Sequence, residues 1–503
     1  MTASLVSAPI ANSDGDIELS PATGREVFAR MNRLDFARWA TQVTGTGGCS
    51  HPVRLVGSST TVDTATGEVV GAYESSTEPD RVTYVRCGNR RADVCASCST
   101  EYAGDLWHQL SAGMVGGKGV PEEIRQHPLV FATLTAPSFG FVHTCNKPGR
   151  TPRRCCPRSA RSMCPHGRPT WCMRVHTGSD VEVGQPLCPD CYDYTGHVIW
   201  QWWAPELWRR FTITLRRHLA RHLAYHLGLT ERAARGLVRV QFAKVAEYQR
   251  RGVVHFHALI RLDGPPTDDD RWPAPRAAVS ADEVCDLVRS AAAAVRYVSP
   301  ADGPHLPPLE LRFGVQVDAR IVHDLADRDD PADSDLHPET VAAYIAKYAT
   351  KATAIEPGAG GQAHLRRLRR TVDRLGRAAT REPLDGLDAD LLAPYGRLGR
   401  WADALGFRGR FGTASRSFSV TLTSLRDARR AFKRERPTGA VAGAPEDGGV
   451  DQSVEEDTTL VVGSWRFVGM GWLTNGDAAL AADTAARARE HRLAKAAARR
   501  GVT

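Results

Sequence analysis

The crowding of cysteines in one part of the chain is the feature that most limits its possible folds. Eleven of the twelve cysteines lie between Cys49 and Cys191. The twelfth, Cys285, falls inside a helical pattern and is interpreted as a small buried apolar residue. The segment from Cys145 to Cys191 is rich in Pro, Arg and Gly, so it is too polar to form a core of its own. We expect bound metal ions to supply the missing core there.

The chain carries no signal for secretion or for a membrane. Its first residues, MTASLVSAPIANSDGD, lack the charged start and the long apolar run of a secretory signal. No run of about 18 apolar residues occurs, so no membrane span is expected. The sequence therefore predicts a cytoplasmic protein whose cysteines bind metal rather than pair as disulfides.

Two groups of cysteines have spacings typical of zinc sites. The first group is Cys87, Cys95 and Cys98, which contains a CxxC pair and could take Cys49 or His51 as a further ligand. Neither CxxC pair opens a helix within a β-α-β unit, which argues against a redox pair. The second group is denser, and its spacing does not decide which ligands share an ion. Its members are Cys145, Cys155, Cys156, Cys164, His166, Cys172, His176, Cys188 and Cys191.

Length and charge set broader limits. The 503 residues predict about three domains of roughly 150 residues each. The formal net charge of +8 permits a polyanionic partner without proving one. Basic residues cluster at 365–370, at 429–436 and near the C-terminus. Each of these clusters is also compatible with an ordinary solvated helix face.

Hydrophobic patterning in the middle of the chain predicts an α+β sandwich with antiparallel pairing. The expected order is strand, helix, strand, strand, helix, strand, helix, and a short turn joins the two middle strands as a hairpin. This order is typical of ferredoxin-like or RNA-recognition-like folds. The predicted strands are 129–135, 238–249, 253–262 and 311–322, and the predicted helices are 204–229, 281–298 and 337–352.

The hairpin carries two histidines that could bind a metal ion. His255 and His257 are two positions apart on a strand, so they share one face. A three-residue turn at 250–252, with Gly252 left-handed, would pair Glu247 with His255 and bring the carboxylate to that face. Such a triad accepts Mg²⁺ or Mn²⁺ when a phosphate supplies oxygen ligands. A two-residue turn would move Glu247 to the other face, and two hydrogen-bonded core histidines remain the alternative.

The last predicted helix contains two overlapping Tyr-x-x-Lys patterns. Tyr344 and Tyr348 are four residues apart and share one helical face, and Lys347 and Lys351 each follow a tyrosine by three positions. A nearby ammonium favours the phenolate form of tyrosine and also binds phosphate. The other interpretation is an amphipathic helix that packs two aromatic rings and leaves its lysines in solvent.

Together these motifs resemble the HUH endonucleases, specifically the rolling-circle replication initiators of actinomycete plasmids and integrative elements. FATLTAP (131–137) is similar to the first family motif, HFHALI to the His-hydrophobic-His metal motif, and YIAKYATK to the motif with two tyrosines. The ordered triple covers 129–353, and the segments CGNRRADVCASC and CPDCYDYTGHV also resemble the actinomycete subgroup. The long cysteine-rich insertion between the first two motifs departs from the family pattern and leaves the order of strands in the sheet open.

The resemblance implies a nicking and strand-transfer mechanism. His255 and His257, with Glu247 as third ligand, would hold Mg²⁺ or Mn²⁺ at the scissile phosphate of single-stranded or extruded origin DNA. Tyr348 would attack first and form a 5′-phosphotyrosine bond, because relatives with one tyrosine usually keep that one. Tyr344 would then close the displaced circle. Lys347 and Lys351 would assist the two phenolates or bind phosphate.

The resemblance also implies a division of the chain and a set of partners. The expected regions are an N-terminal region with a zinc module (1–125), an HUH endonuclease domain (126–353) with a zinc-binding insertion at about 143–195, and a basic C-terminal region without an assigned motif (354–503). The zinc modules and basic tracts would bind duplex origin DNA. Single-stranded DNA, a host helicase and a DNA polymerase are the other expected partners.

Two other interpretations stay open. An HUH transposase or relaxase shares this chemistry, although relaxases usually place the tyrosine before the histidines, whereas here it follows them. A non-catalytic, zinc-dependent regulator that binds the origin would explain the cysteines and the charge. It would leave the histidine pair and the tyrosine pair as coincidences.

Overall fold

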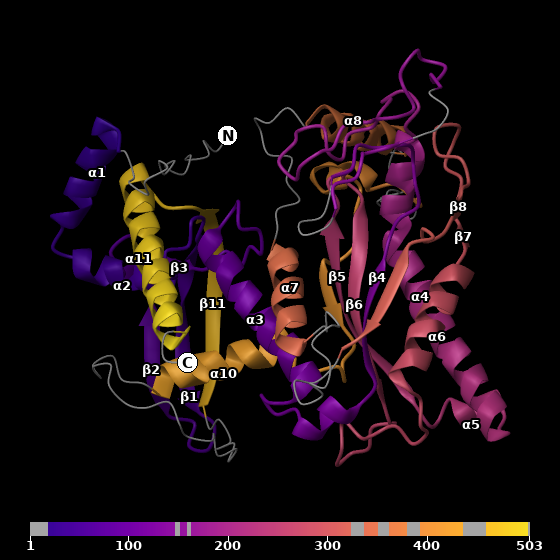
Figure 1. Cartoon of the computed structure of the whole chain (residues 1–503). Coiled ribbons are helices and arrows are strands. Elements are labelled where there is room, and N and C mark those ends of the chain that lie inside the picture. The colour runs from indigo at the N-terminus through magenta and orange to yellow at the C-terminus, as the bar shows by residue number, and fades with distance from the viewer. Residues whose placement is uncertain are drawn as a thin grey trace, which may run out of the picture. The chain divides into compact units, whose positions relative to one another are not determined.

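The structure is a computed structural model that describes residues 19–145, 151–157, 162–322, 337–350, 362–379, 393–435 and 459–500. It confirms an α+β fold with antiparallel sheets (Figure 1). One compact unit combines residues 1–104 with 428–503, and the other comprises 105–427. This division differs from the three consecutive regions expected from the sequence, because elements near both chain ends pair with each other. Among the described residues, no helix has the length and apolar character needed to cross a membrane.

The first unit is built on a small antiparallel sheet with β1 (Val53–Asp63) at its centre. β1 pairs with β2 (Val69–Glu74), with β3 (Thr83–Val85) and, along its whole length, with β11 (Thr459–Met470). The unit also contains α1 (Pro21–Met31), α2 (Phe36–Gly45), the short 3₁₀ helix η1 (Ser75–Thr77) and α11 (Asn475–Arg500). Helices α3 (Ala96–Val115) and α10 (Leu422–Glu435) each contain a boundary between the two units.

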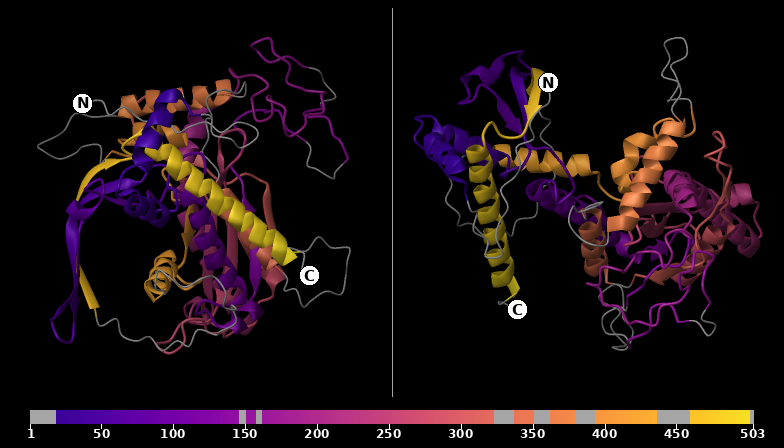
Figure 2. Two further views of the ribbon diagram at one scale, coloured as in Figure 1. Left: turned by 90° about the vertical axis from the view of Figure 1, so that its left-hand side faces the viewer. Right: turned by 90° about the horizontal axis from the view of Figure 1, so that it is seen from above.

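Buried ion pairs join the two ends of the chain within the first unit. Figure 2 shows α1 beside the start of α11. There the buried Arg30 donates from Nε to Asp477 Oδ1 at 2.6 Å and from Nη1 to Asp80 Oδ1 at 2.9 Å. Because all three side chains are almost fully buried, each charge depends on the others for its solvation.

The second unit is built on a five-stranded antiparallel sheet in the order β10-β5-β6-β4-β9. Along the chain the elements follow the predicted order of strand, helix, strand, strand, helix, strand, helix, which is therefore confirmed. β10 extends the sheet beyond the predicted set. The five strands are β4 (Leu129–Leu134), β5 (Arg239–Tyr248), β6 (Val254–Asp263), β9 (Val317–Ile321) and β10 (Gly412–Ala414).

Helices cover both faces of this sheet (Figure 1). The long α4 (Tyr194–Leu227) and α6 (Ala281–Ala294) pack together on one face, and α7 (Pro338–Thr350) lies against the other. α8 (Gln362–Ala379) packs on α4 and on the 3₁₀ helix η3 (Leu398–Ala404). Shorter elements are η2 (Glu122–Gln126), α5 (Glu231–Ala234), β7 (Tyr297–Val298) and β8 (Glu310–Leu311).

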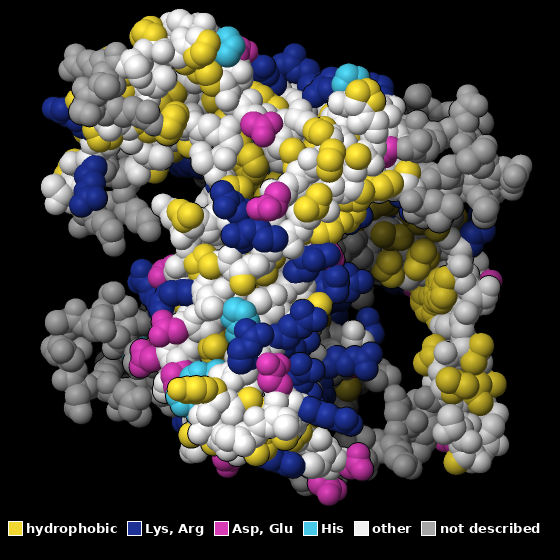
Figure 3. Space-filling view, turned by 90° about the vertical axis from the view of Figure 1, so that its right-hand side faces the viewer, with side chains coloured by type: hydrophobic (Ala, Val, Ile, Leu, Met, Phe, Trp, Pro, Cys, Tyr) yellow, Lys and Arg dark blue, Asp and Glu magenta, His cyan; other side chains and the backbone are white. Residues whose placement is uncertain are grey.

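A basic groove lies between α4, α5 and the start of β5. We call it the arginine groove; it is lined by Arg216, Arg217, Arg235 and Arg239 around an apolar floor that includes Leu223, and its volume is about 470 Å³. No carboxylate is among its described lining residues. Figure 3 views this side of the molecule and shows Lys and Arg side chains gathered on it.

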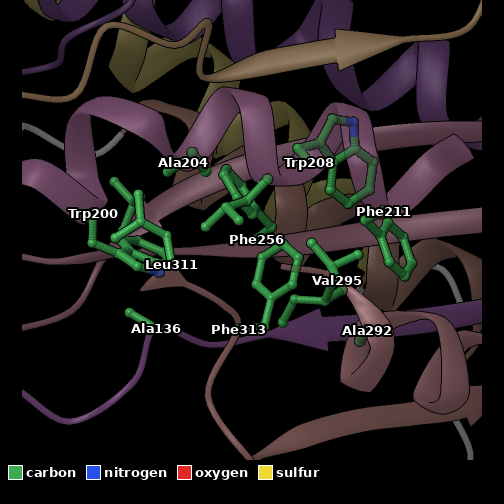
Figure 4. Close-up of a cluster of buried hydrophobic side chains, with 14 of the residues drawn as sticks. Ala136, Trp200, Ala204, Trp208, Phe211, Phe256, Ala292, Val295, Leu311 and Phe313 are labelled. Atoms are coloured by element: carbon green, nitrogen blue, oxygen red, sulfur yellow. The ribbon is translucent and has the colours of Figure 1, made fainter. Parts of the chain in front are cut away.

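Aromatic side chains form the core between α4 and the sheet. Figure 4 shows Trp208 and Phe211 from α4 turned toward Phe256 of β6 and Phe313. The ring centroids of Trp208 and Phe256 are 5.6 Å apart, and Phe256 is fully buried. Since successive strand residues point to opposite faces, this core on Phe256 places His255 and His257 on the face toward α7.

Three element boundaries predicted from the sequence were wrong. α4 begins at Tyr194 rather than near Ala204, because Asp193 caps it by accepting from Gly196 N at 2.7 Å. Pro205 therefore lies inside the helix, where buried aromatic residues in the flanking turns outweigh its missing N–H. The strand predicted at 311–322 breaks into β8 and β9 around Gly314. The helix predicted at 281–298 ends at Ala294, and its last residues form β7.

We predict that Gly252→Ala destabilises the second unit by about 2–5 kcal/mol. Gly252 has a φ of 78°, and an added Cβ would lie 2.8 Å from Leu365 Cδ2 and 2.9 Å from Leu368 Cδ1. Gly228→Ala is the matched control, since its φ is 64° with no atom within 4 Å of the added Cβ. It should cost only about 1–2 kcal/mol. Equal losses in urea unfolding of the two variants would contradict the crowding at Gly252.

Candidate active site and metal centres

The β5–β6 hairpin has the register that the metal hypothesis needs. Glu247 pairs with His255, and Val245 pairs with His257. The turn is closed by Gln249 N donating to Val253 O and by Gly252 N donating to Gln249 O, each at 2.8 Å. The left-handed Gly252 fits the predicted three-residue turn. The predicted register is confirmed, and the Glu247 side chain lies on the histidine face.

Glu247, His255 and His257 form a compact triad. Glu247 Oε2 lies 3.1 Å from Nε2 of each histidine, and the two Nε2 atoms are themselves 3.1 Å apart. Ligands at about 2.1 Å on adjacent corners of an octahedron lie about 3.0 Å apart. The three atoms therefore fit one face of an octahedral site and leave the opposite face for other ligands. All three side chains are at most 15% exposed.

Neighbouring side chains on the sheet hold His257 in place. Its Nδ1 lies 3.1 Å from Thr133 Oγ1 on β4. A metal ion would use the Nε2 lone pair, so Nδ1 would then carry the proton and donate a hydrogen bond to Thr133 Oγ1. The ring of Phe131 stacks on His257 with centroids 5.6 Å apart. Both neighbours belong to the FATLTAP motif, and sequence reasoning had assigned them only to a strand.

Tyr344 on α7 brings a phenol to the triad. Its hydroxyl lies 3.5 Å from His257 Nε2, and its ring meets those of His257 and Phe131 edge-on. Its side chain is 38% exposed, so one side remains open to solvent. The residue lines a cavity of about 760 Å³ together with both histidines and Thr133. We call this cavity the triad pocket.

The other residues predicted around the two tyrosines are described less completely. Lys347 is exposed on α7. Tyr348 follows one turn after Tyr344 in the same helix, but its side chain lies outside the described residues, and so does all of Lys351. The predicted roles of Tyr348, Lys347 and Lys351 stay predictions.

The turn of the hairpin is held by α4. The carbonyl oxygen of Gly252 accepts hydrogen bonds from Gln201 Nε2 at 2.9 Å and from His197 Nε2 at 3.3 Å. Gln201 Oε1 in turn accepts from Val254 N at 2.9 Å. Tyr192 lies 2.9 Å from His197 Nδ1, which is left to accept from its hydroxyl. These buried contacts fix the end of the hairpin that carries the triad.

α8 holds the same turn from another side. His364 Nε2 donates to Arg251 O at 3.0 Å, and Tyr194 OH lies 3.0 Å from His364 Nδ1. In a neutral imidazole the second nitrogen of His364, like that of His197, accepts from the tyrosine hydroxyl beside it. Burial is the main cause that lowers the pKa of His364 to about 4 and the pKa of His197 well below its ordinary value. The two imidazoles are therefore neutral at pH 7.

The first cysteine group folds into one tetrad with Cys49 as the fourth member. Sγ–Sγ distances are 3.6 Å for Cys49–Cys98 and 3.7 Å for both Cys49–Cys95 and Cys87–Cys98. A disulfide requires about 2.05 Å, whereas thiolates around a tetrahedral ion at about 2.3 Å lie about 3.8 Å apart. The tetrad thus has the dimensions of a metal centre, and it takes Cys49 rather than His51.

The second cysteine group divides into two tetrads, each within the second unit. One is His143, Cys155, Cys172 and His176, and the other is Cys164, His166, Cys188 and Cys191. Cys172 Sγ lies 3.5 Å from His176 Nε2, and Cys188 Sγ lies 3.7 Å from His166 Nδ1. The corresponding edge of a tetrahedral site with mixed ligands is about 3.5 Å. Both sets could hold a metal ion.

Sequence reasoning missed one ligand candidate and proposed two cysteines that lie outside these tetrads. His143 was missed because it falls before the first cysteine of the insertion. Its position two residues before Cys145 could have marked it as a candidate metal ligand. Cys145 is exposed, and Cys156 has its Sγ 3.6 Å from that of Cys155 without completing either tetrad.

Comparison with known sequences shows that this protein is of a class that acts in DNA replication. The family model "Replication initiator protein, pSAM2" matches residues 35–486. The chain belongs to this family of replication initiators. A protein of Streptomyces ambofaciens named "Replication initiator protein" is 37% identical over 487 residues, which cover 93% of this chain and 94% of that protein. No solved structure matches the chain.

We predict that Cys98→Ala removes one tightly bound metal ion per chain. Cys98 is 3% exposed and belongs to the first tetrad, so its loss leaves three ligands and an open position. Cys285→Ala, at a buried cysteine of α6 outside the tetrads described, should retain the full metal content. Elemental analysis of the purified proteins measures both. Unchanged metal content in Cys98→Ala would contradict the assignment.

We predict that protonation of His364 contributes to acid destabilisation. Its pKa is about 4 in the folded protein and near 6.5 ordinarily, so the unfolded chain binds the proton first. The stability it contributes is complete above pH 6.5 and is lost as the pH falls toward 4, by about 3 kcal/mol at pH 4. Urea unfolding of wild type and His364→Gln from pH 7 to pH 4 should show a shallower loss in the variant. Parallel curves would contradict the prediction.

Proposed function

We propose that this replication initiator nicks one DNA strand at its origin with a tyrosine and so starts rolling-circle replication. The observation that carries the proposal is the position of the Tyr344 hydroxyl, 3.5 Å from Nε2 of a histidine in the metal-binding triad. A phenol beside a divalent metal site is suited to attack on a phosphodiester, because the metal ion polarises the phosphate. A protein that only binds DNA has no need of a phenol beside a divalent metal site.

The topology of the second unit supports an HUH-type core. Without β10, the sheet order is β9-β4-β6-β5, and every neighbouring pair is antiparallel. In chain order this is 4-1-3-2, the arrangement of a ferredoxin-like split β-α-β fold. The metal ligands come from its central hairpin, and the tyrosine helix follows its last strand. This order supports the proposal of an HUH-type core.

The chain's own residues have distinct roles in the proposed reaction. Glu247, His255 and His257 would hold Mg²⁺ or Mn²⁺, which supplies charge stabilisation at the phosphate. The tyrosine oxygen forms a bond to phosphorus while the bond from phosphorus to the 3′ oxygen breaks. The proton lost by the tyrosine balances the one gained by the 3′ oxygen. The product is a 5′-phosphotyrosine and a free 3′-hydroxyl for DNA synthesis.

We propose that Tyr344 makes the first attack, because its hydroxyl lies 3.5 Å from His257 Nε2 at the triad. The expected order from the family resemblance, in which Tyr348 attacks first, is the direct alternative. In either order the second tyrosine can resolve the junction after one round of synthesis. Lys347 and Lys351 would lower the cost of the phenolate or contact phosphate.

The three tetrads are proposed to hold structural Zn²⁺. Four-coordinate sites made of Cys, or of Cys and His, are typical of structural zinc, whereas Mg²⁺ and Mn²⁺ prefer oxygen ligands. Amide donors also point at the sulfurs of the first tetrad: Ser50 N lies 3.4 Å from Cys95 Sγ, and Cys87 N lies 3.4 Å from Cys49 Sγ. Such hydrogen bonds stabilise thiolate charge and suit a closed structural site.

The arginine groove supports contact with duplex DNA on the α4 side of the sheet, whereas the triad faces α7. It is basic, carries no described carboxylate, and lies at the start of β5. Glu247 stands eight residues further along that strand, which corresponds to roughly 26 Å, or about eight base pairs. The arginines of the groove can bind the phosphate backbone of duplex origin DNA at this distance along the strand from the triad. A host helicase and a polymerase remain the expected partners for the following steps.

Two alternatives predict different DNA products. An HUH transposase or relaxase would cut at the ends or the transfer origin of its element rather than at a replication origin. A zinc-dependent regulator would bind the origin without cutting it. Family membership favours the replication role over both.

We predict metal-dependent nicking of a supercoiled plasmid that carries the chain's own origin. With Mn²⁺ the purified full-length protein should produce open circles whose 5′ end is bound to protein. Tyr344→Phe and His257→Ala should each lower the initial rate on the order of a thousandfold or more, because a reacting group or a metal ligand is lost. Omission of Mn²⁺ should have the same effect. Gel electrophoresis and a labelled 5′ end measure both products.

Tyr225→Phe is the control for this experiment, since Tyr225 is exposed near the far end of α4. It should nick like wild type. If Tyr348→Phe removes the covalent product and Tyr344→Phe does not, the proposed order of attack is reversed. If wild type binds the origin but never cuts it with any divalent metal, the regulator interpretation replaces the proposal.

A further inference from the structure

A second and larger cavity adjoins the triad pocket. Its volume is about 850 Å³, and it shares Thr135, Gln249 and Gln316 with the triad pocket. The two cavities are therefore neighbours that meet at the end of β4 and the end of β5. Pockets of about 300–1,000 Å³ are large enough for a drug-sized ligand, a size class that includes a nucleotide. We call the larger cavity the flanking groove.

The metal-binding insertion builds one wall of the flanking groove. Residues 141–145 and 183–184 line it, opposite the hairpin turn and residues 312–316. The wall is a small ladder in which Leu187 N donates to Phe141 O at 2.9 Å and His143 N donates to Gln185 O at 2.8 Å. His143 also belongs to one of the tetrads. The wall thus contains a candidate metal ligand.

The insertion is packed directly against the hairpin turn. Gly184 has a φ of 90°, and an added Cβ would lie 2.7 Å from the backbone carbon of Arg250. Only a glycine allows this close approach of the two backbones. The contact sets the insertion beside the hairpin that carries the triad, so the position of the wall relative to the triad is defined within the second unit.

The chemistry of the flanking groove fits a single strand of nucleic acid. Phe141 is 52% exposed and Val315 is fully exposed, so apolar surface faces the cavity. Arg250 and Arg312 are exposed and also line it, and no carboxylate is among its described lining residues. An exposed aromatic ring with nearby guanidinium groups is the combination that stacks bases and follows a phosphate backbone.

We propose that the flanking groove binds single-stranded DNA next to the scissile phosphate, with Phe141 stacking on a base and Arg250 and Arg312 contacting phosphates. The inference rests on the proposed function, because that function places the scissile phosphate in the triad pocket. It assigns to the metal-binding insertion a direct part in holding the substrate strand. A duplex presents no unstacked base to Phe141, so the groove should discriminate against it.

The test measures binding of a fluorescein-labelled twelve-nucleotide oligo-dT by fluorescence anisotropy. The full-length protein is used with its structural metals bound and without added Mn²⁺. Phe141→Ala should weaken binding by roughly five- to a hundredfold, the loss of one stacked base, and Phe141→Trp should restore it. Arg250→Ala and Arg312→Ala should each lower the slope of log Kd against log salt concentration by about 0.7.

Two matched controls lie outside the groove. Tyr225→Ala removes an exposed aromatic ring, and Arg276→Ala removes an exposed arginine. Both should bind the oligonucleotide like wild type. Thermal unfolding of every variant checks that the fold is kept, which the exposure of Phe141, Arg250 and Arg312 favours.

The outcomes separate this inference from the proposed function. If Phe141→Ala, Arg250→Ala and Arg312→Ala bind like wild type while wild type nicks the origin plasmid, the groove assignment is wrong and the nicking proposal stands. If the variants weaken binding but wild type never nicks, the groove assignment stands and the nicking proposal fails. If a duplex of the same length competes as well as the single strand, the groove does not select single-stranded DNA.

Discussion

The hydrogen bonds to the carbonyl oxygen of Gly252 are the interaction on which the candidate active site depends. Gln201 and His197 from α4 both donate to this one atom. They anchor a turn whose left-handed glycine sets the register of the hairpin, and the register decides whether Glu247 faces the histidines. A slip of one residue would move the carboxylate to the core side of the sheet. The proposed metal site is therefore a consequence of backbone geometry several residues away.

The part of the site that follows from local rules could be predicted from the sequence. Strand alternation put His255 and His257 on one face, and turn chemistry at Gly252 then brought Glu247 beside them. Contacts between distant segments could not be predicted in this way. Thr133 and Phe131 reach His257 only because β4 lies next to β6, and His143 joins its tetrad only after the insertion has folded. The start of α4 was also missed. A proline usually lies in the first turn of a helix, but burial of aromatic residues stabilises α4 on both sides of Pro205.

The three tetrads lie in parts of the chain that are poor in apolar residues, where bound metal ions would take the place of a hydrophobic core. The described part of the insertion contains no strand, only isolated bridges such as the one between Cys156 and Cys172. Ligand bonds can therefore supply much of the order there. In the present proposals this order has a functional use, because the ordered insertion forms the wall beside the triad. Under these proposals, the structural metal ions would order the wall that holds the DNA strand, and the catalytic metal ion would act on the scissile phosphate of the same strand.

β1 pairs with β11, a strand that the ribosome synthesises much later than β1. Met470 follows its partner Val53 by roughly 400 residues, which a ribosome needs roughly 20–80 s to add at 5–20 residues per second. The second unit is complete in sequence before β11 has been synthesised. The N-terminal strands must wait with an unpaired edge until the last part of the chain arrives. A chain that ended anywhere before β11 would leave that edge of β1 without its partner strand, so the first unit could not complete its sheet.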